Sequence, residues 1–159
     1  MRTTPPALLP ILRSQVQGEV LARLYLHPDE EHSLAELAEL TATSPQSIQH
    51  EVSRLVKAGL LRDRRLGRSR LIRANPDSIL ARPLTDLLMV TYGPVPVLES
   101  ELGPIEGIEQ AFVFGSWAAR HQGISGAIPN DVDVMVVGRA NLDALDDAAG
   151  RAQEVYGAP

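Results

Sequence analysis

The chain has 159 residues, of which 44% are hydrophobic, and its formal net charge is −5. It contains no cysteine, which excludes disulfides and thiolate metal sites, and no apolar run is long enough to cross a membrane. The N-terminus lacks the charged start, apolar stretch and cleavage site of a signal peptide. We therefore expect a cytoplasmic protein with no membrane partner.

Charge is distributed unevenly along the chain. Residues 1–82 hold 12 basic and 9 acidic residues, a net charge of +3, whereas residues 83–159 hold 3 and 11, a net charge of −8. Nine of the fifteen basic residues fall between Arg54 and Arg82. This asymmetry predicts two modules with different partners, and it keeps the first module a candidate for nucleic-acid binding.

Three helices are predicted before the basic region. Apolar residues recur at helical spacing in residues 7–26. Ser33 and Glu36 form a capping-box pattern at the start of a short helix whose leucines we expect to face inward. After a three-residue turn, Ser44 is a candidate N-cap, with Pro45 at the first helical position.

The helix that follows Ser44 separates an apolar face from a polar one. The expected buried face comprises Ile48, Val52, Leu55 and Val56, which recur at helical spacing. The opposite side carries amide, hydroxyl and basic side chains, which can bond to base edges or phosphates. Gly59 is the residue type that commonly ends such a helix.

A basic hairpin is predicted directly after this helix. Residues 60–61 open a strand, residues 67–69 form a turn, and residues 71–72 return. Six arginines stand on it against one acid, Asp63. A solvated surface is the alternative, but an uncommitted surface would mix the two signs of charge. The candidate DNA-binding residues are Ser44, Gln46, Ser47, Gln49, His50, Ser53, Arg54, Arg64, Arg65, Arg68 and Arg70.

This order of helix, short helix, turn, helix and hairpin resembles the winged helix-turn-helix transcription regulators of the bacterial ArsR/MarR type. The resemblance implies that residues 1–75 bind double-stranded DNA. Residues 76–97 contain an apolar connecting helix and a linker. In such regulators a helix after the wing often pairs with a second subunit, which implies a homodimer through Leu84, Leu87 and Leu88; the alternative is that this helix packs under the second module.

A second group of candidate site residues lies in the sequence after Ile108. Residues 111–114 read as a short buried strand that runs into Gly115 and Ser116, with a helix from Trp117. Asp131 and Asp133 stand two apart in a strand predicted over residues 131–137, so both carboxylates should face the same way about 6.6 Å apart along the chain. Such a pair favours a hard divalent cation. Ser116 and the N–H groups of the following helix can hold a phosphate.

These elements resemble the DNA polymerase beta-type nucleotidyltransferase superfamily in its minimal form. The resemblance implies that Gly115 and Ser116 grip a nucleoside triphosphate and that Asp131 and Asp133 hold Mg²⁺. Arg120 stands one position beyond the basic residue often found in that family, and we include it as a nucleotide contact.

The family's third carboxylate does not appear in the sequence. After Gly138 the chain offers a helix over residues 141–156, with Leu142 and Leu145 expected to face inward. The third carboxylate is therefore absent, or it belongs to a longer chain that continues past Pro159. Whether this module is an enzyme stays open.

The sequence as a whole predicts an α+β protein. A winged helix-turn-helix precedes a small α/β nucleotidyltransferase-like domain with a short mixed sheet, over residues 98–159. We expect a DNA-binding transcription regulator whose second domain binds nucleotide and Mg²⁺ or supports assembly. The alternatives are an active nucleotidyltransferase that modifies a protein or a small molecule, and an antitoxin-like protein that binds a protein partner.

Overall fold

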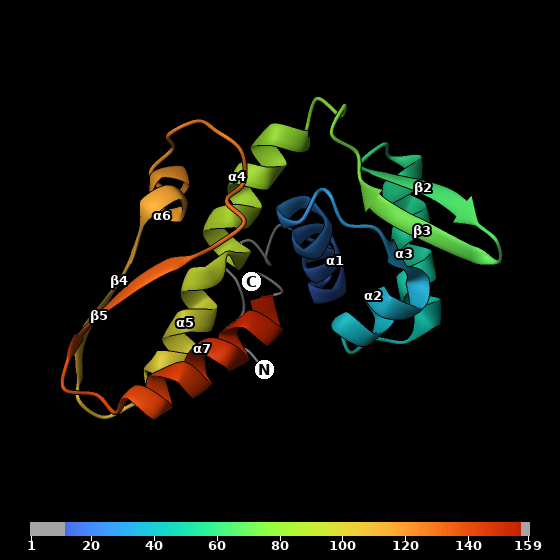
Figure 1. The fold of residues 1–159 in the computed structure, drawn as a ribbon. Helices are drawn as coiled ribbons and strands as arrows, with labels where there is room; N and C mark the ends of the chain where they lie inside the picture. The colour runs from blue at the N-terminus through green and yellow to red at the C-terminus, as the bar shows by residue number, and fades with distance from the viewer. Residues whose placement is uncertain (1–11, 157–159) are drawn as a thin grey trace. The chain divides into compact units, whose positions relative to one another are not determined.

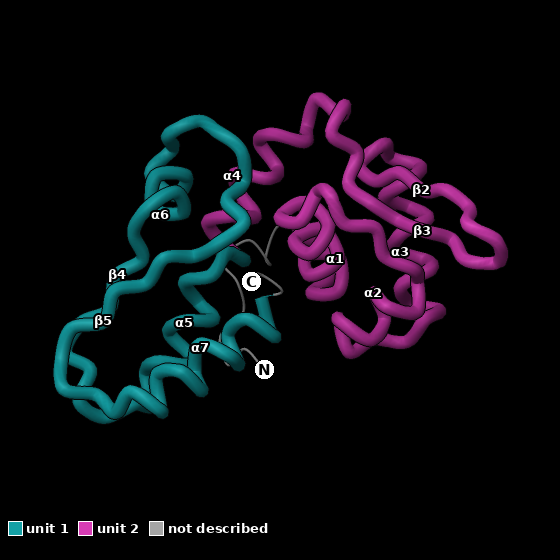
Figure 2. The backbone as a smooth tube through the Cα atoms, viewed as in Figure 1, with its two compact units in different colours: residues 1–5, 92–159 teal, residues 6–91 magenta. Residues whose placement is uncertain are grey.

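The computed structural model describes residues 12–156, which divide into two compact units, residues 12–91 and residues 92–156 (Figure 2). Helix α4, Ala81–Tyr92, falls almost wholly in the first unit. None of the helices in the described part of the chain is long and apolar enough to cross a membrane.

The first unit packs three helices against a three-stranded antiparallel sheet with the order β1-β3-β2 (Figure 1). Besides α4, its elements are α1 (Gln15–Leu26), β1 (His32–Ser33), α2 (Leu34–Leu40), α3 (Pro45–Lys57), β2 (Leu61–Leu66) and β3 (Ser69–Ala74). The β2–β3 hairpin extends beyond the helices as a wing (Figure 1). This unit is therefore a winged helix-turn-helix.

The predicted caps of this unit are confirmed for α2 and α3. The Ser33 and Glu36 side chains each accept a hydrogen bond from the other's backbone N–H, at 3.2 and 2.7 Å. The Ser44 hydroxyl accepts from the N–H of Ser47 at 3.2 Å, with Pro45 in the first turn. Helix α1 begins later than predicted, because Ser14 caps it; residues 7–11 lie outside the described residues.

The core of the first unit is built from the apolar stripes of the three helices and from the sheet. Its fully buried members include Val20, Leu24, Leu37, Ile48, Val52, Leu61 and Ile72. Leu40 was expected to face inward but is exposed, and Val56 is only half-buried. The hydroxyl of Tyr25 donates to the Leu60 carbonyl at 2.5 Å, which fixes the point where the hairpin leaves α3.

Strand β1 was not predicted. It is two residues long and pairs with β3, with His32 opposite Ile72 and Ser33 opposite Leu71. Two residues are too few to carry a periodic pattern, so no signal for this strand was present in the sequence. Its consequence is that the acidic turn before it, which includes Glu31, lies beside the sheet.

Helix α4 has a buried side and an exposed apolar side. Leu88 and Met89 are buried, whereas Leu87 and Val90, and Leu80 just before the helix, are exposed. The pairing of this helix with a second subunit through Leu84, Leu87 and Leu88 stays a prediction.

The second unit contains one two-stranded antiparallel sheet and three helices. They are α5 (Pro94–Leu102), β4 (Ile108–Phe114), α6 (Gly115–His121), β5 (Asp133–Gly138) and α7 (Leu142–Tyr156). Within the described residues this sheet is antiparallel, so the predicted mixed sheet is wrong. Helices α5 and α7 pack side by side (Figure 1), and Arg151 pairs with Glu101 between them at 2.7 Å.

The buried side of α7 consists mainly of small residues, and Leu145 is half-buried. Ala148 and Ala152 are buried, whereas Leu142, which was expected to face inward, is exposed. Trp117 of α6 is buried and meets the ring of Tyr156 edge-on, with 5.8 Å between centroids. The sheet itself leaves apolar surface uncovered: Phe112 and Met135 stand opposite each other and are 44% and 50% exposed.

Candidate nucleic-acid interface

The outward side of α3 is polar and open. Burial of Ile48, Val52 and Leu55 fixes the rotation of the helix about its axis, which leaves the other side exposed. The exposed residues are Ser44, Gln46, Ser47, Gln49, His50, Ser53, Arg54 and Lys57. Ser44 also has a structural role, because its hydroxyl caps the helix and donates to the hydroxyl of Ser47 at 2.9 Å.

The six arginines of the hairpin are divided between its two faces. Side chains alternate along a strand, so the register that places Arg65 opposite Arg70 puts both on one face together with Asp63. Arg70 donates to Asp63 at 2.7 Å and to the Ser53 hydroxyl of α3 at 3.2 Å. This is the near face of the hairpin, and it continues the exposed side of α3.

The tip of the hairpin adds one more cation. Leu66 pairs with Ser69 across a two-residue loop, and Gly67 has φ +60°, which its lack of a Cβ permits. Arg68 in this loop is exposed, as is Arg65 beside it. Neither forms an ion pair with any of residues 12–156, so both remain available to an anion such as a phosphate.

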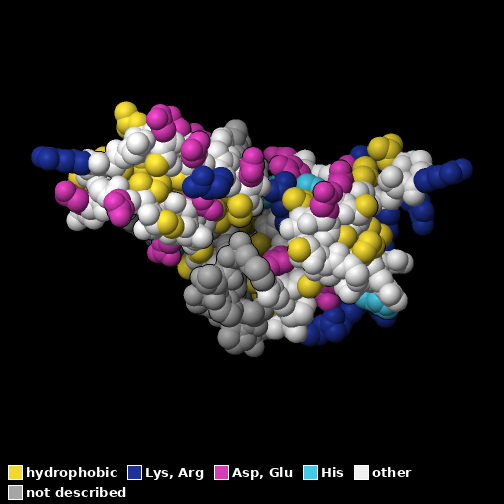
Figure 3. Space-filling view, turned by 90° about the horizontal axis from the view of Figure 1, so that it is seen from below, with side chains coloured by type: hydrophobic (Ala, Val, Ile, Leu, Met, Phe, Trp, Pro, Cys, Tyr) yellow, Lys and Arg dark blue, Asp and Glu magenta, His cyan; other side chains and the backbone are white. Residues whose placement is uncertain are grey.

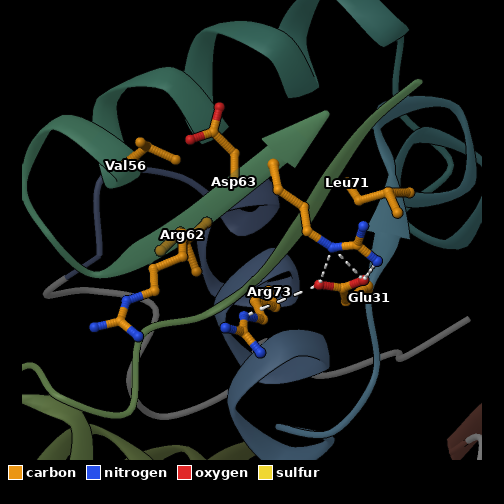
Figure 4. Close-up of a pocket in the computed structure, with 8 residues that line it drawn as sticks. Glu31, Val56, Arg62, Asp63, Leu71 and Arg73 are labelled. Atoms are coloured by element: carbon orange, nitrogen blue, oxygen red, sulfur yellow. Dashed lines mark hydrogen bonds and ion pairs between the residues drawn. The ribbon is translucent and has the colours of Figure 1, made fainter. Parts of the chain in front are cut away.

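The other three arginines project from the opposite face, which we call the outer face. Arg62 stands opposite Arg73 in the register, and Arg64 stands opposite Leu71. Figure 4 shows Arg62, Arg73 and Glu31 on one side of β2 and Asp63 on the other.

Acids from outside the hairpin neutralise part of the outer face. Arg64 donates two hydrogen bonds from Nε to the Glu31 carboxylate, at 2.9 and 3.0 Å, and Arg73 approaches the same carboxylate at 4.0 Å. The hydrogen bonds from Arg64 lower the pKa of Glu31. Arg62 pairs with Asp77. Arg64, which was predicted as a DNA contact, therefore lies on the face away from α3 and is paired with Glu31.

A cavity of about 260 Å³ adjoins the hairpin (Figure 4). Its walls combine charged side chains with aliphatic ones. The lining residues are Glu31, Val56, Leu61, Arg62, Asp63, Arg64, Leu71 and Arg73.

Sequence reasoning missed a buried carboxylate on the inward side of α3, that of Glu51. Glu51 is only 5% exposed at its side chain, and one of its oxygens accepts from Arg13 at 2.5 Å. The other oxygen, Oε1, has no partner among the described residues. Its spacing from Ile48 and Leu55 puts Glu51 on the apolar stripe, and this spacing was the available signal.

Basic side chains gather over the part of the first unit that carries α3 and the hairpin (Figure 3). Acidic side chains are more frequent over the second unit in the same view. The uneven charge along the sequence is thus also uneven on the surface.

Gly115 and Asp133, two of the residues predicted to bind nucleotide and Mg²⁺, lie close together. Gly115 has φ +68°, and a Cβ built on it would lie 2.5 Å from Oδ2 of Asp133. The Asp133 carboxylate therefore lies against the start of α6, where only glycine leaves room for it. Ser116, the next residue, is exposed.

The other predicted nucleotide and metal contacts are not placed as expected. Asp131 is exposed in the loop before β5, so the two aspartates do not share a strand. The guanidinium of Arg120 donates to the Ile124 carbonyl and would contact a Cβ at Gly126, so it lies over the loop after α6. Among residues 12–156, no group of three or more His, Cys, Asp or Glu side chains could hold a metal ion.

Known proteins resemble the first unit. A helix-turn-helix domain family matches residues 14–64, which contain α1, α2 and α3, and leaves the second unit out. Residues 14–64 are therefore a helix-turn-helix domain. No curated protein matches the chain significantly.

Two solved structures of Lactococcus lactis ZitR share a general likeness with the chain. One, a cysteine-to-serine mutant of ZitR in complex with DNA, is 17% identical, covers 65% of this chain and 68% of its own, and has a TM-score of 0.47. The other, described as a zinc-responsive MarR family member, is 20% identical, covers 58% and 62%, and has a TM-score of 0.45. Likeness of this degree carries no conclusion about what this chain binds.

Proposed function

We propose that this protein is a DNA-binding transcription regulator that reads double-stranded DNA with the exposed side of α3 and the near face of the hairpin. The observation that carries the proposal is the bond from Arg70 to Ser53, which joins these two surfaces into one. Arg70 also neutralises Asp63, the acid on that face of the hairpin.

The two parts of this surface have different chemistry. Gln46, Gln49 and Ser53 on α3 offer donors and acceptors that can distinguish base edges in a major groove. Arg65 and Arg68 on the hairpin are charged and exposed, which suits phosphate contacts that set affinity and position.

A direct binding measurement tests this proposal. Labelled genomic duplexes are titrated with the protein at about 50 mM salt, and the titration is repeated at higher salt and with Mg²⁺ and nucleoside triphosphates. Binding that weakens steeply with salt is expected, because phosphate contacts release counterions. Absence of binding to every duplex at low salt would end the proposal.

We further propose that the regulator acts as a homodimer. One recognition helix covers only a few base pairs, so operators usually pair two half-sites about one helical turn apart. The exposed apolar residues of α4, Leu87 and Val90, offer surface for such a pairing. A monomer by light scattering at micromolar concentration, with and without DNA, would contradict it.

A second candidate function concerns the second unit: binding of a nucleotide with Mg²⁺ by Gly115, Ser116, Asp133 and Asp131. The supporting observation is the Asp133 carboxylate held against a glycine of positive φ. Calorimetry with ATP and GTP, with and without Mg²⁺, tests it, and Asp133→Asn should abolish any Mg²⁺-dependent binding.

Two outcomes would redefine this second unit. Transfer of a labelled nucleotide to a protein or small molecule would make the chain an active nucleotidyltransferase. Suppression of a co-expressed toxic protein, without nucleotide binding, would favour the antitoxin-like role. In either case the DNA-binding proposal is tested separately.

A further inference from the structure

The sheet of the second unit has open edges. It consists of β4 and β5, and within residues 12–156 no further strand lies beside either of them. A two-stranded sheet is only marginally stable by itself, and the backbone N–H and C=O groups along its edges can pair with another strand. β4 is interrupted by a register shift between Ile108 and Gln110, which disturbs its edge, whereas β5 is regular.

Strand β5 lacks the features that usually keep an edge strand from pairing. Residues 132–137 contain no proline and no lysine, and the one charge among them is that of Asp133. The carboxylate of Asp133 lies against Gly115. The other five residues are valines and a methionine, a composition that favours strand pairing. A further strand is therefore expected at β5 rather than at β4.

One face of this sheet is apolar and exposed. Phe112 stands opposite Met135, and alternate residues share a face, so Phe114 and Val137 lie on the same side. These four side chains are between 40% and 50% exposed. No residue of β4 or β5 is fully buried. Exposed apolar patches of this kind mark interaction surfaces, so the sheet offers a partner both an edge and a face.

The charges on either side of β5 are complementary to a second copy of the same strand. Asp131 lies four residues before Met135, and Arg139 lies four residues after it. Both are exposed, and neither forms an ion pair with any of the described residues. If two copies of β5 run antiparallel with Met135 opposite Met135, Asp131 of each copy faces Arg139 of the other. A two-fold axis generates this contact twice.

We propose that the edge of β5 is an interface between two copies of this chain, with the strands antiparallel and Met135 at the two-fold axis. The two sheets then form one four-stranded sheet in the order β4-β5-β5-β4. Opposite charges in facing positions are stabilising and like charges are destabilising, so the pairs of Asp131 with Arg139 select this register. A parallel pairing would instead bring Asp131 beside Asp131.

The apolar part of this interface comes from the exposed face. Met135 of each copy lies beside the other, and Phe112 flanks each of them on β4, which gives one apolar stripe across the four strands. The pairing involves residues of the second unit alone. It is therefore independent of DNA binding and of the contact proposed for α4.

The net charge of the second unit sets the conditions of the test. Residues 83–159 carry a net charge of −8, so two copies repel each other at low salt. At about 150 mM salt the screening length is about 8 Å, which weakens this long-range repulsion more than it weakens ion pairs in contact. Self-association is therefore measured on the full chain at this salt concentration.

A single introduced cysteine tests the pairing directly, because the chain has none of its own. Directly opposed residues of antiparallel strands have Cα atoms about 4.5 or 5.5 Å apart, within the range of about 4.4–6.8 Å that a disulfide spans. Met135→Cys should therefore form a disulfide-linked dimer under mild oxidation, seen on a non-reducing gel. Val155→Cys is the matched control, since Val155 is exposed on α7, and it should stay largely monomeric.

Exchange of charges tests the register. Sedimentation velocity at micromolar concentration should show a dimer for the wild type. Asp131→Arg and Arg139→Glu should each weaken self-association by about tenfold, because each sets like charges opposite each other in both symmetric contacts. Glu154→Arg changes the charge of the exposed side of α7 by the same amount as Asp131→Arg, and it should associate like the wild type.

A mixture of the two charge variants is the sharpest test of the register. In the mixed dimer every acidic side chain at positions 131 and 139 faces a basic one, so Asp131→Arg and Arg139→Glu together should associate more tightly than either variant alone. Circular dichroism confirms that each variant is folded. A mixture that associates no better than its components would contradict the proposed register.

Three further results would overturn the proposal. A wild-type chain that stays monomeric throughout the micromolar range would show that β5 does not pair with a second copy. Equal crosslinking of Met135→Cys and Val155→Cys would show random collision. Self-association that Leu87→Gln removes, and that Asp131→Arg leaves intact, would assign the pairing to α4 instead.

Discussion

The Nη1 group of Arg70 lies 3.2 Å from the hydroxyl oxygen of Ser53, which links the hairpin to the exposed side of α3. The same guanidinium holds Asp63 at 2.7 Å through Nε. Arg70 thus does two things at once: it orients the wing against the helix and removes the charge of the acid beside it. The near face is left with Arg65 and Arg68 as its uncommitted cations among the described residues.

Removal of Arg65 or Arg68 should weaken DNA binding to the same extent for every DNA sequence. Arg65→Ala and Arg68→Ala should each reduce the slope of log affinity against log salt by about 1, because each phosphate contact releases about one counterion. Arg64→Ala is the control, since Arg64 lies on the outer face, and its slope should equal that of wild type. Fluorescence anisotropy with unrelated duplexes at several salt concentrations measures all three slopes; an equal loss in Arg64→Ala would contradict the assignment of faces.

Changes on α3 should alter sequence preference instead. Gln46→Ala or Gln49→Ala should reduce discrimination between the preferred duplex and a single-base variant by roughly 1–3 kcal/mol, the usual value of a good base contact. Competition between paired duplexes at fixed salt measures this. An unchanged salt slope would distinguish the effect from loss of a phosphate contact.

Helix α3 was predictable from the sequence because its signals are local. Ser44, Pro45 and the apolar spacing of Ile48, Val52 and Leu55 each lie within the helix or at its end. The division of the arginines between two faces was not predictable, because it depends on the register across the two-residue loop at Gly67. The approach of Glu31 depends on β1, a strand that only tertiary pairing defines.

The second unit shows the same limit at its predicted metal pair. Asp131 and Asp133 alternate with valines, and this pattern favoured a single strand that includes both aspartates. The ladder begins where Phe114 pairs with Asp133, at the end of β4, so Asp131 remains outside it. The sequence predicted a helix directly after Gly115 and Ser116. The contact between the backbone of Gly115 and Asp133 could not be predicted, because it follows from the pairing of Phe114 with Asp133.

The buried carboxylate of Glu51 should make stability depend on Arg13. Arg13→Ala leaves a charge with no partner on a side chain that is 5% exposed, and we expect a loss of about 1–3 kcal/mol in the free energy of unfolding. The value stays below that of a fully buried pair because Arg13 is 52% exposed. Urea unfolding measures it.

A compensating change supplies the control for the Glu51 prediction. Leucine at position 51 would extend the apolar stripe of α3, so Arg13→Ala combined with Glu51→Leu should recover most of the lost stability. If the double variant is as unstable as Arg13→Ala alone, the unpaired carboxylate is not the cause of the loss.

Tyr25 should make the protein less stable in alkali. Burial raises the pKa of its phenol above the ordinary value of 10.0. Below pH 10.0 both the folded and the unfolded chain keep the phenol proton, and the contribution of Tyr25 to the free energy of unfolding is fully present. As pH rises past it, the unfolded chain loses the proton first, so stability falls until pH passes the raised folded pKa.

Substitution of Tyr25 by phenylalanine isolates this effect. Tyr25→Phe should remove the part of the stability loss in alkali that comes from the phenol. It should also reduce stability at neutral pH by about 0.5–1.5 kcal/mol, the usual net value of one hydrogen bond. The Leu60 carbonyl keeps a second donor, the N–H of Asn75 at 3.1 Å. Urea unfolding from about pH 7 to pH 11 compares the two proteins, and identical slopes above the ordinary phenol pKa of about 10 would contradict the prediction.

Two glycines allow the contact between Gly115 and Asp133 to be measured. Both Gly115 and Gly123 have positive φ, +68° and +85°, but a Cβ at Gly123 would meet nothing within 4 Å, whereas at Gly115 it would meet Oδ2 of Asp133 at 2.5 Å. Gly123→Ala should therefore destabilise by about 1–2 kcal/mol through the backbone alone. Gly115→Ala should lose more free energy of unfolding, because Asp133 must also move.

In a double-mutant cycle with Asp133→Ala, this excess should appear as a coupling energy of about 0.5–3 kcal/mol between positions 115 and 133, and no coupling is expected between positions 123 and 133. Urea unfolding of the wild type and the single and double variants measures both cycles, and equal losses for Gly115→Ala and Gly123→Ala would show that Asp133 does not lie against Gly115 in solution.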